Sequence, residues 1–250
     1  MAMSLALFES RDKVETVQFD IAGIRDTYAE IAEAQKECEG SIVYRIKVGA
    51  GGSKNFEIVT GDDDMDASVP SFRGVIIHSH RCNAYWGGSD IANQPPECSS
   101  MDGISGVDSN GEVLCCKDCD WNQFGSASKG RGKACKNMQR LYIFVEGVPI
   151  PMLLTLPPTS LSAFRSYRVS SLAGRKLKPN EVVTEFTLTQ KTTQDGIKYS
   201  VVKFRLVGRL NEADKAFAKI LTESLKPKVD ITADDYSVPE ESNENNESAV

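Results

Sequence analysis

The sequence contains few histidines and few tryptophans, two of each, and it has no long apolar run. No stretch approaches the roughly 18 to 20 apolar residues that a membrane-spanning helix requires, so no membrane association is expected. Residues 1–15 lack a basic leader followed by an apolar segment long enough for a signal peptide. We therefore expect a cytoplasmic protein, in which cysteines stay reduced.

Motifs that would mark an enzyme are also missing. The chain has neither a G-x-x-x-x-G-K-[ST] phosphate loop nor a G-x-S-x-G nucleophile turn. Its histidines, His78 and His80, end the strand-like segment GVIIHSH, and together with Ser89 and Asp90 they resemble the metal motif of JAMM-type isopeptidases. The spacing departs from that motif, because Asp90 directly follows Ser89 and the count from His80 to Ser89 is one residue too long. We therefore expect a binding protein. A metal-dependent hydrolase ranks third, after the two kinds of binding protein described below.

Charge is distributed unevenly along the chain, whose net charge is -6. Residues 230–250 contain no Lys or Arg but hold a run of acids, namely Asp230, Asp234, Asp235, Glu240, Glu241, Glu244 and Glu247. The remaining residues 1–229 are close to neutral, so the low pI does not exclude a polyanionic partner. The acidic tail is poor in apolar residues and is expected to be disordered. Such a tail can dock basic partner proteins, or it can serve only to keep the chain soluble.

Hydrophobic periodicity predicts a body with more strand than helix. Alternation predicts strands at residues 42–48, 55–60, 72–80, 141–146, 152–156, 182–189 and 199–207. Helical spacing predicts helices over residues 21–38, from Pro158 to about Gly174, and from Asn211 onward. With the cysteine-rich segment set aside, part of this order, namely strand, strand, strand, helix, strand, strand, is that of the OB-fold. A generic α+β domain is the alternative. The expected fold class is thus α+β or mostly β: an OB-fold-like five-stranded barrel with flanking helices, formed by residues 1–229.

The segment 81–137 breaks this periodicity and contains six of the seven cysteines. So long an irregular stretch within a compact body needs another source of order. Cys98, Cys116, Cys119 and Cys135 follow the pattern C-x17-C-x2-C-x15-C, and a C-x2-C pair places two thiolates at the separation that tetrahedral Zn²⁺ requires. We therefore predict a zinc-stabilised insertion. Cys82, Cys115, His78 and His80 remain alternative ligands. Cys38 lies in the first predicted helix, where it is expected to be packed as a small hydrophobic residue.

Aromatic and basic residues interleave around these cysteines. Cations that contact phosphates and rings that stack on bases are what a protein needs to bind unpaired nucleic acid. The candidate stacking residues are Tyr85, Trp86, Trp121 and Phe124. The candidate phosphate contacts are Lys129, Arg131, Lys133, Lys136 and Arg140. The alternatives are that the tryptophans form a small core over the zinc and that the cations form a solvated face.

The combination of these features resembles phage single-stranded DNA-binding proteins. The residues that carry the resemblance are C-x2-C-x-W-N-Q-F-G-S and G-K-A-C-K within the insertion, the OB-like strand order and the acidic C-terminal residues 230–250. The resemblance implies a protein of the bacterial cytoplasm that coats single-stranded DNA during phage or mobile-element replication and recombination, and that contacts replication or recombination proteins through its tail. A zinc-stabilised adaptor or regulator that binds protein or duplex DNA is the second alternative.

Overall fold

The computed structural model describes residues 14–21, 23–37, 44–62, 64, 66–87, 94–128 and 131–224. Strands dominate these residues, so the expected mostly-β class is confirmed. The strands are β1 (Tyr44–Val48), β2 (Phe56–Val59), β3 (Ala67–Val69), β4 (Ser71–Tyr85), β5 (Cys98–Ser100), β6 (Ser105–Asp108), β7 (Val113–Cys115), β8 (Lys136–Val145), β9 (Met152–Leu156), β10 (Val182–Thr192) and β11 (Lys198–Arg209).

Helices are fewer: one lies at each end of the described chain, and most of the others lie between β9 and β10. They are α2 (Arg25–Glu37), α3 (Leu161–Ser166), α4 (Glu212–Ser224), the π-helical η3 (Tyr167–Leu172) and the short turns η1 (Asp120–Asn122), η2 (Pro158–Ser160), η4 (Ala173–Arg175) and η5 (Pro179–Glu181). The three predicted helices correspond to α2, to the run from η2 through η4, and to α4. Cys38, the last residue of the first predicted helix, lies outside the described residues. Within the described part of the chain, every helix is too short or too polar to span a bilayer.

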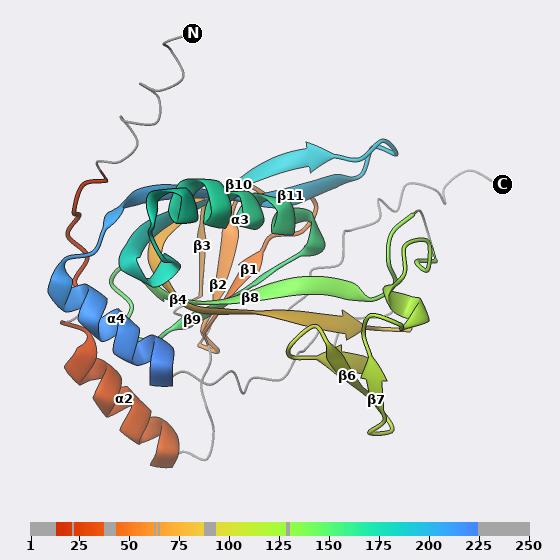
Figure 1. Cartoon of the computed structure of the whole chain (residues 1–250), viewed down its shortest axis with the longest axis horizontal. Coiled ribbons are helices and arrows are strands. Elements are labelled where there is room, and N and C mark those ends of the chain that lie inside the picture. The colour runs from red at the N-terminus through yellow and green to blue at the C-terminus, as the bar shows by residue number, and fades with distance from the viewer. Residues whose placement is uncertain are drawn as a thin grey trace, which may run out of the picture.

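The sheet is organised around β4, its longest strand (Figure 1). β8 runs antiparallel to β4 along most of its length, β10 pairs with the beginning of β4, and β5 pairs with its end. On one side the sheet continues from β8 through β9, β1 and β2 to β3, with β1 parallel to β9. On the other side β5, β6 and β7 form a small antiparallel meander, and β11 pairs with β10. No pairing among the described residues closes this sheet, so the closed five-stranded barrel is not confirmed.

The body of the sheet nevertheless curls around a single main core. Phe56 of β2 lies edge-on to Phe72 of β4 at a centroid distance of 5.0 Å, although these two strands are not paired. Phe72 in turn stacks on Phe186 of β10 at 4.5 Å. Apolar residues of β1, β8, β9, β11 and α3 complete the same cluster. Burial of this cluster is the main source of stability for the body.

A second cluster covers the opposite face of the sheet. Phe217 and Leu221 of α4 pack with Val75 of β4 and Phe144 of β8. Tyr28 of α2 contacts Phe144 edge-on, with ring centroids 5.8 Å apart. Both faces of the sheet are buried where the start of β4 pairs with the end of β8, and this part is held in the body. The end of β4 and the start of β8 extend from the body as a paired arm.

The prediction that residues 81–137 are irregular is wrong in part. β4 continues to Tyr85, β8 begins at Lys136, and β5, β6 and β7 lie between them. These three short strands contain Gly, Ser and Cys in place of alternating apolar residues, so periodicity could not reveal them. The extension of β4 supplies their pairing edge, and Cys82, Trp86 and Met138 form a small core beside it.

Phe186→Ala tests the central aromatic stack. Because Phe186 is fully buried, we expect the free energy of unfolding to fall by about 3–5 kcal/mol in urea denaturation. Phe124→Ala is the matched control: its side chain is 82% exposed, and the same measurement should change by about 0.5 kcal/mol or less. Equal losses for the two variants would contradict this assignment of the core.

Candidate nucleic-acid interface

Four cysteines from three segments of the insertion line one small cavity. Cys98 comes from β5, Cys116 and Cys119 from the turn after β7, and Cys135 from the residue before β8. The volume of the cavity is about 20 Å³, close to the minimum that a single water-sized occupant needs. The structure therefore brings together the four cysteines that the spacing singled out. A Cys₄ set of this kind has the chemistry of a structural Zn²⁺ site.

Gly106 of β6 explains how two of the thiols approach. A methyl group on Gly106 would lie 2.9 Å from Cys98 Sγ and 3.6 Å from Cys116 Sγ. A side chain at this position would therefore push the thiols apart. Neither Cys82, which is fully buried in the small core, nor the exposed Cys115 lines this cavity.

The electrostatics of the cavity favour neutral thiols unless a cation is present. Burial, followed by the negative charges of Cys116, Cys119 and Cys98, raises the pKa of Cys135 to about 12, against a smaller opposing effect of Lys133. Burial likewise raises the pKa of Cys98, followed by the neighbouring cysteines and Asp108. Among the described residues, no three His, Cys, Asp or Glu side chains already stand as a closed metal-holding group. The four thiols line one cavity without forming such a group, and a bound cation would lower their pKa values.

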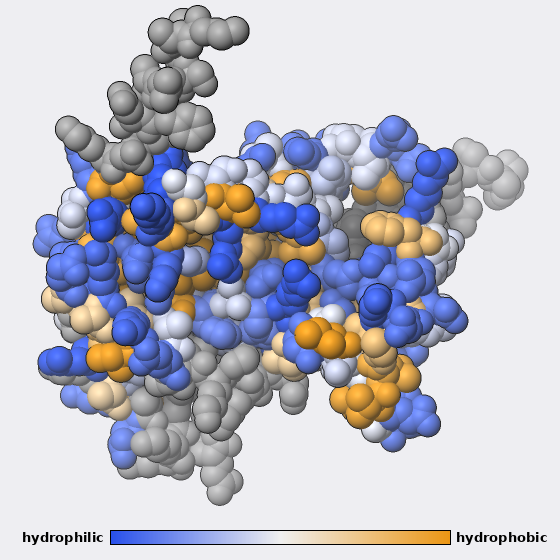
Figure 2. All heavy atoms as spheres, viewed as in Figure 1, coloured by the Kyte–Doolittle hydropathy of each residue, from blue (hydrophilic) through white to orange (hydrophobic). Residues whose placement is uncertain are grey.

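Aromatic rings cover the thiol cavity. Tyr85 and Trp121 both line it, and their rings stack at a centroid distance of 4.7 Å with an interplanar angle of 11°. Trp121 is still 47% exposed, and the neighbouring Phe124 is 82% exposed. Apolar side chains gather at the surface of the projecting insertion in Figure 2, where Val113 of β7 is 73% exposed.

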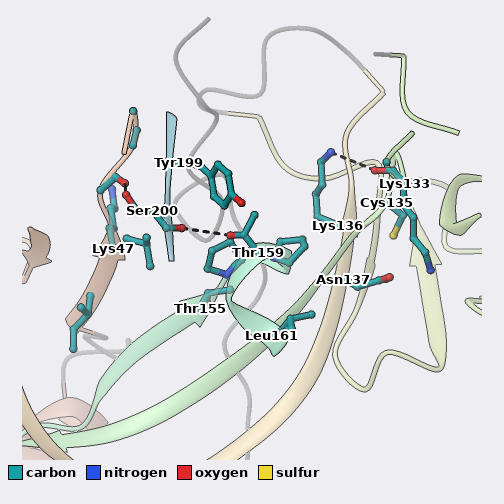
Figure 3. A pocket seen from close by; sticks show the side chains of 18 of the residues that line it. Lys47, Lys133, Cys135, Lys136, Asn137, Thr155, Thr159, Leu161, Tyr199 and Ser200 are labelled. Carbon is teal, nitrogen blue, oxygen red and sulfur yellow. Dashed lines mark hydrogen bonds between the residues drawn. The ribbon is translucent and has the colours of Figure 1, made fainter. Parts of the chain in front are cut away.

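A second, larger cavity of about 490 Å³ opens beside the insertion (Figure 3). Its walls come from β1 and the turn after it, from β9 and η2, from the start of β11, and from residues 132–137. Five cations line it, and no Asp or Glu is among the described residues of its wall. These cations are Arg45, Lys47, Lys133, Lys136 and Lys198. The cavity is therefore suited to an anionic ligand.

Three of the predicted nucleic-acid contacts line this cavity: Phe124, Lys133 and Lys136. Sequence reasoning missed Arg45, Lys47, Lys198 and Tyr199. Alternation within IVYRIKV does place Arg45 and Lys47 on the side of β1 opposite Ile46, but only the parallel pairing of β1 with β9 brings them near the insertion.

The structure places the other predicted contacts elsewhere. Arg140 is fully buried in β8, where its Nη1 donates to Met101 Sδ at 3.7 Å, so it does not reach a surface where a phosphate could bind. Trp86 is only 9% exposed, and its indole N–H donates to the Gln94 carbonyl. Arg131 is exposed but does not line the cavity. Lys129 lies outside the described residues.

The thiol cavity and the basic cavity share a wall. Cys135 lines both of them. Asn122, which lines the thiol cavity, donates through its Nδ2 to the Cys116 carbonyl at 2.5 Å, while its Oδ1 accepts from Lys133 Nζ at 3.2 Å and from Asn137 Nδ2 at 2.9 Å. Lys133 and Asn137 both line the basic cavity. The cysteine turn therefore holds side chains of the basic wall in place through one amide.

The two histidines form a separate cluster on β4. The rings of His78, His80 and Tyr142 lie with their centroids 5.8–5.9 Å apart, and His80 Nδ1 is 2.8 Å from the Met101 carbonyl oxygen. Burial lowers the pKa of His78, and the neighbouring His80 lowers it further. Ser89 and Asp90, the other parts of the hydrolase motif, lie outside the described residues. The histidines do not line the thiol cavity.

Comparisons with protein-family models, with curated proteins and with solved structures found no match for this chain. The features of this chain that point to a function are therefore the two cavities and the rings beside them.

Asn122→Ala tests the connection between the cavities. The change removes partners of the Cys116 carbonyl, Lys133 and Asn137, so we expect the free energy of unfolding to fall by about 1–3 kcal/mol. Asn110→Ala, in the exposed turn after β6, serves as the control and should change this value by about 0.5 kcal/mol or less. The account of the connection fails if thermal or urea unfolding does not separate the two variants.

Proposed function

We propose that this protein binds single-stranded DNA, and that it does so along the basic cavity and the exposed rings of the insertion. The observation that carries the proposal is the basic cavity itself, which combines five cations and no described acid with apolar walls. A nucleic acid strand presents the complementary pattern of phosphates and flat bases. Exposed Phe124 lines this cavity, and exposed Trp121 on the insertion extends the pattern beyond it.

The connectivity of the body supports an OB-like nucleic-acid-binding domain. β4, β8 and β9 form an antiparallel meander, α3 and η3 follow, and β10 returns to pair with β4 before β11. This is the strand, strand, strand, helix, strand, strand order of the OB-fold. In that scheme the insertion connects the first two strands, and the cavity lies between it and the β10–β11 hairpin. OB-folds bind oligonucleotides with the corresponding loops.

We further propose that Cys98, Cys116, Cys119 and Cys135 hold a structural Zn²⁺. The shared cavity, and the effect of the neighbouring cysteines on the pKa values of Cys98 and Cys135, support this set. Zinc would replace the repulsion between thiolates with attraction and fix the insertion against β4 and β8. In this proposal the zinc is structural and takes part in no reaction, because the protein is proposed to bind DNA and not to act as an enzyme.

The wider role follows from the resemblance and from composition. We propose that the protein acts in phage or mobile-element replication and recombination within the bacterial cytoplasm. The acidic residues 230–250, which lie outside the described residues, would contact replication or recombination proteins by charge complementarity.

Zinc binding is tested by substitution of two cysteines that are adjacent in the sequence, only one of which lines the thiol cavity. Cys116→Ser should lose the one zinc ion that we expect per chain, because Cys116 lines the thiol cavity. Cys115→Ser should keep it, because Cys115 is exposed and does not line the cavity. Metal content is measured by atomic absorption after dialysis against metal-free buffer. Retention of zinc by Cys116→Ser, or its loss from Cys115→Ser alone, would contradict the proposed ligand set.

DNA binding is tested by fluorescence titration with oligo(dT) and with duplex of equal length. We expect tighter binding to oligo(dT), and a dissociation constant that rises steeply with salt. Lys47→Gln and Lys198→Gln should each weaken binding several-fold and lower the salt slope by roughly 0.7, the contribution of one phosphate contact on a single strand.

Lys219→Gln in α4 is the control for these two variants. Its side chain is 75% exposed and does not line the cavity, so affinity and salt slope should not change. Equal binding of duplex and oligo(dT) would favour the duplex-binding regulator, and absence of binding to either would overturn the proposed function.

A further inference from the structure

The basic cavity has features that a groove for the phosphate backbone alone would not require. Its walls include apolar surfaces that are only partly buried, from Pro157, Leu161 and Tyr199. Its volume of about 490 Å³ lies within the range of cavities that enclose small organic ligands. The cations therefore surround an interior that is suited to a flat, uncharged group.

The arrangement of these residues is visible in Figure 3. Tyr199 and Thr159 lie on one side of the cavity, and Lys133 and Lys136 lie on the other. Thr159 Oγ1 donates to the Ser200 carbonyl at 3.5 Å, which ties the start of η2 to β11 next to Tyr199. Lys136 Nζ donates to the Lys133 carbonyl at 3.4 Å, so the two lysines belong to one local structure. An aromatic ring thus faces a cationic wall across a space with apolar surfaces.

We propose that this cavity receives a nucleobase of the bound strand, which stacks on Tyr199 while the adjoining phosphates contact the lysines of the opposite wall. The inference rests on the proposed function and names the part of the strand that enters this site. A nucleotide has the matching chemistry, because its base is flat and uncharged and its phosphate is anionic. Trp121 of the insertion, which does not line this cavity, would stack on another base outside it.

Base insertion would also explain a preference for unpaired strands. A base in a duplex is stacked and paired, and its extrusion costs a few kcal/mol. An unpaired base can enter the cavity without breaking a pair. The cavity would then select single strands through access to the base, whereas the cations alone would attract any polyanion.

Photo-crosslinking locates the inserted base. The full chain is bound to oligo(dT) of about 15 nucleotides that carries iodouracil in place of thymine, irradiated and digested with trypsin. We expect the main cross-link on the peptide Tyr199–Lys203, which trypsin releases because Lys198 precedes it. Tyr199→Phe should keep the affinity for oligo(dT), and Tyr199→Ala should weaken it by about tenfold through the loss of one stacking contact.

A bulky side chain can also fill the cavity without a change of charge, and a second variant serves as its control. Thr159→Trp places a bulky ring at the wall and should weaken oligo(dT) binding by about tenfold, the effect of one lost stacked base. Thr192→Trp is the control, because Thr192 is exposed at the end of β10 and does not line the cavity. Its affinity should match that of the unmodified protein.

The outcomes separate this inference from the proposed function. If oligo(dT) binds but cross-links only outside the cavity, for example at Trp121, and Thr159→Trp binds as tightly as Thr192→Trp, base insertion is overturned while single-strand binding stands. If free dTMP saturates the cavity and the oligonucleotide gives no cross-link at Tyr199, the site belongs to a free nucleotide and the inference is also overturned. If the unmodified protein does not bind oligo(dT), the proposed function itself fails.

Discussion

The stability of the insertion depends on four closely placed thiols. Their ionised forms repel one another, so a source of free energy must offset that repulsion. Burial and the neighbouring thiolates hold the pKa of Cys135 at about 12, which means that this thiol resists ionisation by itself. The surrounding segment has only a small apolar core, centred on Cys82, Trp86 and Met138. Apolar burial can therefore account for little of the stability of this region. In our proposal a divalent cation supplies the missing free energy by attracting the four thiolates.

This local constraint reaches the proposed binding surface through a short path. Cys135 is followed directly by β8, which runs into the main core, and Lys133 of the basic wall lies two residues before it. Asn122 links the cysteine turn to Lys133 and Asn137 on the side of the basic cavity. The position of cations on one wall is thus determined by the thiol cluster, whereas Lys47 and Tyr199 on the other wall are positioned by the body of the sheet. A bound strand would contact both parts of the molecule.

Some of this arrangement could be predicted from the sequence because it depends on local spacing. The C-x2-C pair singled out the cysteine set, and alternation located the strands of the body. The environments of Arg140 and Trp86 could not be predicted in this way, because they depend on the pairing of β4 with β8, which places Arg140 opposite His80 in the interior. Tyr199 was missed for a similar reason: its role depends on β11 lying beside the turn after β1, where Ser200 Oγ donates to the Gly49 carbonyl. Residues far apart in sequence form the cavity, so a local sequence pattern cannot predict that they lie close together.

The central claim is that the metal-held insertion and the body of the sheet form one single-strand binding surface. The most direct test is the affinity for oligo(dT) of one protein sample before zinc removal, after removal and after zinc is restored, with far-UV circular dichroism recorded at each step. The account predicts that removal weakens binding by about tenfold or more while the signal of the body is retained, and that restored zinc recovers the affinity. Unchanged affinity in a sample shown to contain no metal would contradict it.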